Sequence, residues 1–228
     1  MTKYICIEGT EGVGKTTQTQ KLVDYLRSLN YSVLQTKEPG TAHSPLTMEL
    51  RNIMLNAKYE PEMTSPAREL ISQAIRSIHL EKVIIPAQGE YDFIVQDRGI
   101  LSGFAYGEAC GNDINWLMGL SDAVVKSASK EFGGQPTLIY DNVILLKGNV
   151  KTGLDKALTA KQEFEAGDAI EMKGLSFMER VNLNMEKYSS WFKATSIDVD
   201  GKSIDDVFAD IIDALNIRSE NDDRSRDR

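Results

Sequence analysis

Short apolar runs alternate with segments of helical periodicity along most of the chain. The apolar runs are typical of strands buried on both faces, and they lie at residues 4–7, 32–36, 93–95, 143–146 and 196–199. The segments predicted as helices lie at residues 16–29, 66–85, 154–164, 168–192 and 204–215. Strands that are separated by helices predict an α/β fold, in which helices flank a five-stranded parallel sheet.

The sequence gives no sign of a division into separate units. No stretch rich in proline, glycine or serine forms a linker, and no internal repeat is present. With 228 residues the chain is long enough for one large domain. We therefore expect a single domain over residues 1–217. The remaining residues, 218–228, are wholly polar, and we expect this tail to be disordered.

The composition excludes several classes of protein. Hydrophobic residues make up 41% of the chain and charged residues 26%, which argues against a largely disordered protein. The 34 acidic residues outnumber the 26 basic ones, so the net charge of −8 disfavours nucleic acid as a partner. No apolar stretch is long enough to span a membrane, and no signal peptide precedes the first strand. We expect a cytoplasmic protein without a membrane partner.

Cysteine and histidine are too rare for two further kinds of site. The chain has two of each, Cys6, Cys110, His43 and His79, and no CxxC motif. Two separate cysteines cannot form a disulfide scaffold, and the absence of a CxxC motif argues against a zinc site of cysteines and histidines.

The segment GTEGVGKT at residues 9–16 fits the phosphate-loop pattern G-x4-G-K-[ST], directly between a predicted strand and a predicted helix. Its glycines let backbone N–H groups wrap a phosphate, the helix N-terminus adds a positive dipole, and Lys15 adds a full charge. A glycine-rich turn without a ligand is the alternative. The residues expected to bind the phosphates of ATP are Gly9, Thr10, Glu11, Gly12, Val13, Gly14, Lys15, Thr16 and Thr17.

Four basic residues, Lys37, Arg51, Arg76 and Arg98, stand out in this acidic chain. Their placement indicates a second anionic ligand, although solvated salt bridges explain most arginines taken singly. Arg98 is the hardest to explain in that way, because it follows Asp97 at the end of an apolar strand. No N-K-x-D motif is present, which disfavours a GTPase.

Further motifs follow the phosphate loop in order. They are KEPGT at 37–41, LRNIML at 50–55, Glu69-Leu70 with Arg76 and His79, Asp97-Arg98 with Ser102 and Ala105-Tyr106, and a weaker stretch at 153–171. In these motifs the chain resembles the thymidylate kinase family from about residue 3 to residue 215. The resemblance implies a P-loop NTPase fold with a small lid, ATP as phosphoryl donor with Mg²⁺, a deoxynucleoside monophosphate as acceptor, and a homodimer.

The resemblance also assigns roles to matching residues. Glu11 is expected to bind the 3′-hydroxyl of the sugar, and Tyr106 to crowd the 2′ position so that deoxyribose is favoured. Arg51 and Arg98 are expected to bind the monophosphate, and Arg76 to contact the edge of the base.

Two sets of site residues follow. The residues expected to bind the monophosphate substrate are Glu11, Lys37, Arg51, Ser72, Arg76, Asp97, Arg98, Ser102 and Tyr106. Thr16 and Asp97 are the expected ligands of Mg²⁺.

The chemistry of this reaction needs no general base, because the second pKa of a phosphate is about 6 and the attacking oxygen is already ionised. Catalysis then consists of alignment and charge neutralisation, for which Lys15, Arg98 and Lys156 are the expected residues. One subclass of the family has an arginine in the phosphate loop where this chain has Gly12, and in the other the lid supplies the cation. The lid expected here, residues 147–173, contains lysines and no arginine. A solvated helix face is the alternative role for its lysines.

The chain departs from the family at three positions. Lys37 replaces an arginine, Gly99 stands where an aromatic residue usually follows the Asp-Arg pair, and Ser72 stands where a phenylalanine lies against the thymine ring. Loss of a stacking ring weakens or broadens selection of the base. Phe104 is the first candidate for a replacement ring.

The predicted function is phosphoryl transfer from ATP to a deoxynucleoside monophosphate, with dTMP, which gives dTDP, as the first candidate. One alternative is a kinase for another or a modified-base deoxynucleotide. A second alternative is a regulatory protein that binds nucleotide without turnover. Glu11, Arg76, Arg98 and Tyr106 favour a kinase, because a switch protein has no use for a monophosphate site.

Overall fold

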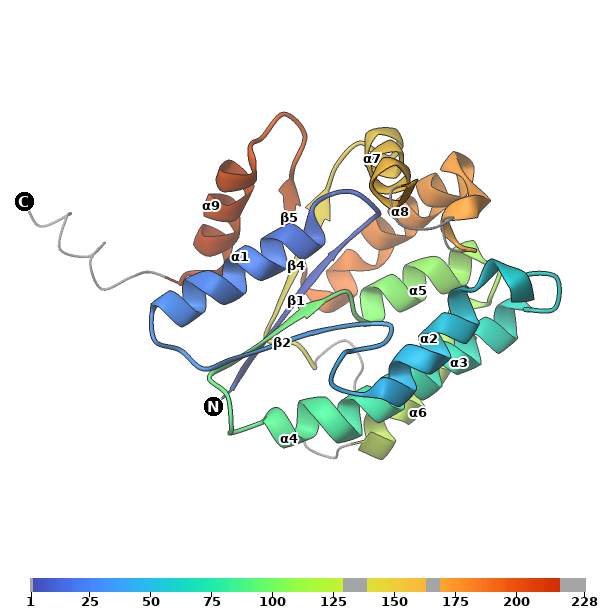
Figure 1. The fold of residues 1–228 in the computed structure, drawn as a ribbon, viewed down its shortest axis with the longest axis horizontal. Helices are drawn as coiled ribbons and strands as arrows, with labels where there is room; N and C mark the ends of the chain where they lie inside the picture. The colour runs from blue at the N-terminus through green and yellow to red at the C-terminus, as the bar shows by residue number, and fades with distance from the viewer. Residues whose placement is uncertain (1, 129–138, 163–168, 218–228) are drawn as a thin grey trace, which may run out of the picture.

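A parallel five-stranded sheet forms the centre of the computed structural model, which describes residues 2–128, 139–162 and 169–217 (Figure 1). The strands follow the order β2-β3-β1-β4-β5. They are β1 (Lys3–Gly9), β2 (Val33–Lys37), β3 (Phe93–Asp97), β4 (Asn142–Lys147) and β5 (Thr195–Asp198). Every predicted strand is confirmed, with its bounds within two residues. The central strand β1 is buried after its first residue, which explains its unbroken apolar run.

Two helices cover one face of the sheet, α1 (Lys15–Ser28) and α9 (Ile204–Leu215) (Figure 1). Leu22 and Leu26 of α1 have no exposed surface and pack with Ile5 and Ile7 of β1. Burial of one such leucine contributes about 1.5–3 kcal/mol. The α1 helix therefore holds the preceding loop against the carboxyl end of β1.

The other face is covered by α5 (Ile100–Ala109) and α8 (Leu175–Ser189), with α3 (Ser65–His79) and α6 (Ile114–Ala128) beside α5 (Figure 1). Phe104 lies in this layer, where its ring packs against the rings of Tyr188 and Phe192.

Three helices were not predicted from periodicity: α2 (Pro45–Leu55), α5 and α6. The α5 helix has no clear polar face, because most of its side chains are buried and it packs against α3, α6 and α8. Asp113 caps α6 by accepting hydrogen bonds from the N–H groups of Asn115 and Trp116. Short apolar helices of this kind carry a weak periodic signal.

Other helix bounds differ from the prediction. The segment predicted at 66–85 consists of α3, a π-helical turn (Leu80–Ile84) and the short α4 (Ile85–Ala87). The helix predicted at 168–192 begins only at Leu175, after a 3-10 turn (Glu171–Lys173) and Gly174 at φ 79°.

The helix predicted at 154–164 is α7 (Val150–Gln162), which begins earlier because the side chain of Asn149 accepts a hydrogen bond from the N–H of Thr152. The polar tail at 218–228 lies outside the described residues. Within the described part of the chain, none of the helices has the length and apolar character needed to cross a bilayer.

Candidate active site

The phosphate loop connects the carboxyl end of β1 to the start of α1. Gly12 and Gly14 have φ angles of 69° and 93°, a backbone region that favours glycine and turns N–H groups to one side. The ammonium group of Lys15 donates a hydrogen bond to the carbonyl oxygen of Thr10 at 2.5 Å. The loop therefore has the conformation expected of a phosphate cradle, with Lys15 held across it.

The charge of Lys15 is only partly stabilised by its surroundings. Burial of the side chain and, to a smaller extent, the charge of Arg98 lower its pKa to about 8, although Glu11 and Asp97 oppose the shift. A bound phosphate adds negative charge and raises this pKa. Lys15 is thus a buried cation that an anionic ligand stabilises.

Thr16 and Asp97 meet beside the loop, where the Thr16 hydroxyl donates to Asp97 Oδ2 at 2.7 Å. Asp97 Oδ1 is buried and has no hydrogen-bond partner among the described residues. Mg²⁺ prefers such oxygen ligands and takes one or two carboxylates together with nucleotide phosphates. The described chain contains no cluster of three or more His, Cys, Asp or Glu residues that could hold a metal by itself. The pair therefore fits a magnesium ion that is shared with a nucleotide.

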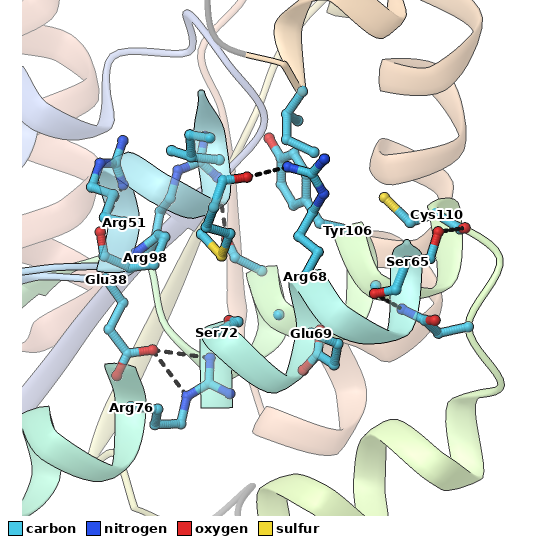
Figure 2. A pocket seen from close by; sticks show the side chains of 18 of the residues that line it. Glu38, Arg51, Ser65, Arg68, Glu69, Ser72, Arg76, Arg98, Tyr106 and Cys110 are labelled. Carbon is cyan, nitrogen blue, oxygen red and sulfur yellow. Dashed lines mark hydrogen bonds and ion pairs between the residues drawn. The ribbon is translucent and has the colours of Figure 1, made fainter. Parts of the chain in front are cut away.

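A cavity opens next to the phosphate loop, between α2, α3 and α5 (Figure 2). Most of the residues predicted to bind the substrate line it: Glu11, Arg51, Ser72, Arg76, Arg98, Ser102 and Tyr106. Arg51 and Arg98 lie together at one end, and Ser65 and Cys110 lie at the other (Figure 2). Two predicted residues, Lys37 and Asp97, line a separate recess along β2 instead.

Arg98 links the cavity to the phosphate loop. Its guanidinium donates to the carbonyl oxygen of Gly9 at 2.9 Å and to Glu11 Oε1 at 2.6 Å. Its backbone has a φ of 64°, which aims the side chain back across the end of β1. Glu11 also accepts a hydrogen bond from the Tyr106 hydroxyl at 3.3 Å. The three predicted sugar and phosphate residues therefore form one connected group.

Glu8 is a site residue that the motifs did not reveal. Its carboxylate has no exposed surface and accepts hydrogen bonds from the N–H groups of Gly99 and Ser102, at 2.8 and 3.1 Å, and from the Ser102 hydroxyl. Burial raises its pKa, although the hydrogen bonds from Ser102 and the charge of Arg98 oppose the rise. The sequence signal that could have identified Glu8 is a carboxylate inside an otherwise apolar strand. Glu8 fixes the turn that carries Arg98.

Arg76 is held by Glu38, to which no role was assigned from the sequence. Its Nε and one terminal nitrogen each lie 3.0 Å from Glu38 Oε2 (Figure 2). On the other side, His79 Nδ1 lies 3.1 Å from Glu38 Oε1. Burial opposes ionisation of Glu38, but Arg76 and His79 outweigh it and hold its pKa below the usual value. The remaining nitrogen of Arg76, NH1, is buried and has no partner in the described chain. It is a donor that a ligand can satisfy.

The far end of the cavity was largely missed from the sequence. It is lined by residues from four parts of the chain: Met54, Leu55, Ser65, Arg68, Glu69, Gly107, Cys110, Asn112 and Ile170. Arg68 is fixed there by hydrogen bonds to the carbonyl oxygen of Met54 and to Glu60, which also pairs with Lys173 at 2.7 Å. These contacts hold the segment that contains Ile170 over the cavity.

The structure differs at the two positions, 72 and 99, where this chain lacks the aromatic residue of the family. Phe104 is 2% exposed and is absent from the lining residues, so it does not replace the ring missing at Ser72. It points away because the adjacent Gly103 occupies the side of α5 that faces the cavity. At Gly99 a neighbour fills the gap. A Cβ there would lie 2.2 Å from the hydroxyl of Tyr140, which accepts a hydrogen bond from the N–H of Ile100.

The α7 helix starts against the phosphate loop. A Cβ on Gly12 would lie 1.9 Å from the carbonyl oxygen of Gly153, and one on Gly153 would lie 2.4 Å from that of Glu11. Only two glycines allow this approach of backbones. Lys156 lies one turn further along α7 with an exposed side chain, and its catalytic role remains a prediction.

Comparisons with known proteins agree with this geometry. A family profile described as thymidylate kinase matches residues 7–211. A thymidylate kinase of Finegoldia magna is 31% identical over 223 residues, which cover 95% of this chain and 98% of that protein. One from Geobacillus is 32% identical over 216 residues, covering 93% and 95%. The crystal structure of thymidylate kinase from Ehrlichia chaffeensis shares the fold, with a TM-score of 0.69 at 22% identity over 95% of this chain and 99% of that one.

Proposed function

Because the chain belongs to the thymidylate kinase family, we propose that it transfers the γ-phosphoryl group of ATP to dTMP, which gives dTDP and ADP. The enzyme class, a nucleoside monophosphate kinase, follows from the family. One observation carries the assignment to this reaction. Arg98 lines the cavity and donates hydrogen bonds to the phosphate loop at Gly9 and Glu11, so a donor site and an acceptor site meet at one guanidinium.

The transfer depends on charge neutralisation between these two sites. Lys15 faces the donor phosphates, and Arg98 and Arg51 face the acceptor phosphate. An arginine binds a phosphate through two parallel hydrogen bonds, which fixes its orientation as well as its charge. The acceptor oxygen is already ionised near neutral pH, so these cations align two anions and no residue needs to remove a proton.

Mg²⁺ would be held by Thr16 and Asp97, together with the phosphates of ATP. When bound, it neutralises charge on the transferred group. The unpartnered Asp97 Oδ1 supports this assignment, because a buried carboxylate oxygen without a donor is a favourable ligand for a hard cation.

Glu11 and Tyr106 would bind the sugar. Glu11 lines the cavity and accepts from Arg98 and Tyr106 through one oxygen, Oε1, so its carboxylate is held beside the expected position of the sugar. Tyr106 stands over the same place, with its ring 5.2 Å from the guanidinium carbon of Arg98. Because Glu11 and Arg98 both contact Tyr106, its ring is held in place and leaves little room for a 2′-hydroxyl.

We assign the lid to residues 147–173, whose described part includes α7. The contact between Gly153 and the phosphate loop supports this assignment, because it ties the position of α7 to that of the donor site. Lys156 on this helix would supply the cation that an arginine at position 12 supplies elsewhere in the family.

A homodimer is proposed from apolar surface on neighbouring helices. Leu46 and Ile53 of α2, Leu70 of α3, and Trp116 and Met118 of α6 are large hydrophobic residues with 36–54% of their surface exposed. These helices lie on one side of the molecule (Figure 1). A second copy of the chain would cover this surface. Sedimentation should give twice the chain mass for the native protein and a monomer for Leu70→Asp.

Product analysis tests the function directly. The protein is incubated with Mg·ATP, with and without dTMP, and ADP and dTDP are quantified. A kinase forms both products in equal amounts and only when dTMP is present. ATP binding without ADP formation under any of these conditions would instead support the regulatory alternative. We place the activity in the cytoplasm, where ATP is supplied.

A further inference from the structure

The end of the cavity far from Arg51 and Arg98 has an unusual lining for a base site. On α3, Ser65, Glu69 and Ser72 recur on one face, and opposite them α5 presents Gly103 and Gly107. Among the described lining residues Tyr106 is the only aromatic one, and it contacts Glu11 at the phosphate end. No ring is therefore available at the far end to stack on a base.

Polar atoms at this end lack partners. Glu69 is 6% exposed, and its Oε1 accepts from Gln73 Nε2 at 2.7 Å, whereas no described residue donates to its Oε2. A Cβ on Gly107 would lie 3.2 Å from Oε2, so glycine leaves that oxygen uncovered on the α5 side. The Ser72 hydroxyl also makes no hydrogen bond within the described residues.

Arg76, one turn beyond Ser72 on α3, adds a second unsatisfied group to the cavity lining. Its side chain is 2% exposed, NH1 has no partner in the described chain, and its NH2 lies 3.0 Å from the Cβ position of Gly103. Buried polar groups without partners carry a free-energy cost of desolvation. An acceptor on a ligand would remove that cost at Arg76 NH1, and a donor on the same ligand would bond Glu69 Oε2.

We propose that this site takes a pyrimidine deoxynucleoside monophosphate whose 5-substituent ends in a hydrogen-bond donor, such as 5-hydroxymethyl-dUMP, and that Ser72 and Glu69 determine this specificity. The proposal rests on the kinase function proposed above and extends it. A carbonyl on the base edge accepts from Arg76, while the substituent hydroxyl donates to Glu69 Oε2 and accepts from Ser72. The methyl group of dTMP leaves Glu69 Oε2 unpaired, and sites built to bond a substrate hydroxyl discriminate against analogues that lack it.

The main test compares kcat/KM for dTMP and 5-hydroxymethyl-dUMP. The wild type should use the hydroxymethyl nucleotide at least as well as dTMP. Ser72→Phe adds a stacking ring and fills the space, so the ratio of kcat/KM values should move toward dTMP by about tenfold or more. Ser77→Phe, on the same helix but outside the cavity lining, should leave the ratio unchanged.

A second pair of variants separates recognition by Glu69 from a structural role. Glu69→Leu removes the acceptor and should lower the ratio of kcat/KM for the hydroxymethyl nucleotide to kcat/KM for dTMP about tenfold. Gln73→Met breaks the same Glu69–Gln73–Ser121 chain of hydrogen bonds without touching the cavity, and it should affect both substrates equally. Thermal melting of each variant checks that it is folded.

Calorimetric measurement of the binding of both monophosphates in the absence of ATP distinguishes the proposed specificity of the site from the proposed kinase function. A preference for the hydroxymethyl nucleotide without any turnover would overturn the kinase function and support the site. Turnover of dTMP, with tenfold discrimination against the hydroxymethyl nucleotide that Ser72→Phe does not change, would overturn the site and leave the kinase function. Equal kcat/KM values for dGMP and for the hydroxymethyl nucleotide would also overturn the proposed specificity, because the far end would then accept any base.

Discussion

The two ends of this active site are built in different ways. The donor end is one loop of eight residues, whose shape comes from glycines at positive φ and from the hydrogen bond of Lys15 to Thr10. The base end is assembled from α2, α3, α5 and the segment around Ile170, and its shape comes from side chains. The donor end presents cations to phosphates, whereas the base end presents a carboxylate and a hydroxyl. Binding of the phosphates, which many substrates share, thus depends on local backbone conformation. Selection of the base depends on packing between segments that are distant in the sequence.

The largest difference between the ends should come from Lys15→Ala. This change removes a charge that faces the transferred phosphoryl group, so kcat should fall about 10³-fold with every acceptor nucleotide tested. The melting temperature should stay near that of the wild type, because the side chain belongs to no hydrophobic cluster. Substantial residual turnover, or a loss confined to one acceptor, would contradict the division into two ends.

At the base end, Arg76→Leu should act on stability as well as on binding. It leaves the buried carboxylate of Glu38 without its main partner, which should lower the free energy of unfolding by about 3 kcal/mol in urea titrations. Lys126→Ala breaks an exposed pair with Asp122 and serves as the control, with a change below about 0.5 kcal/mol. Equal effects of the two variants would mean that Glu38 is solvated.

The contact between α7 and the phosphate loop can be broken with one methyl group. Gly153→Ala places a Cβ 2.4 Å from the carbonyl oxygen of Glu11, so α7 must move away and kcat should fall about tenfold. Gly119→Ala, also within a helix, meets no atom within 4 Å and should only stabilise the protein slightly. If both variants kept full kcat, the position of α7 would be irrelevant to catalysis.

The smallest expected effect is on the pH dependence of ATP binding. The pKa of Lys15 is lowered to about 8 in the free protein by burial and by Arg98, and bound phosphate raises it. Above that pKa the protein must take up a proton to bind ATP, so the Kd for ATP should rise about fourfold from pH 7 to pH 8.5. Calorimetry should show matching proton uptake. Lys15→Arg stays charged and should give a flat profile.

The elements that could be predicted from sequence are those whose signal is local. Strands buried on both faces are continuous apolar runs, and all five were located within two residues. The phosphate loop was also found, because its glycines, Lys15 and Thr16 are contiguous. The α5 helix was missed since burial on most sides hides its periodicity, and Phe104 was misplaced because a position in sequence does not say which side of a helix it faces.

The sequence by itself determined the fold and the donor end, since backbone geometry and local spacing specify both. Only the tertiary structure decided the base end. Residues as distant as Met54, Glu69, Cys110 and Ile170 meet there through helix packing, and no local pattern marks their encounter. The roles of Glu8 and Glu38 also emerged only in three dimensions. A buried carboxylate must find its donors wherever the fold brings them, and here those donors lie at Ser102, Arg76 and His79.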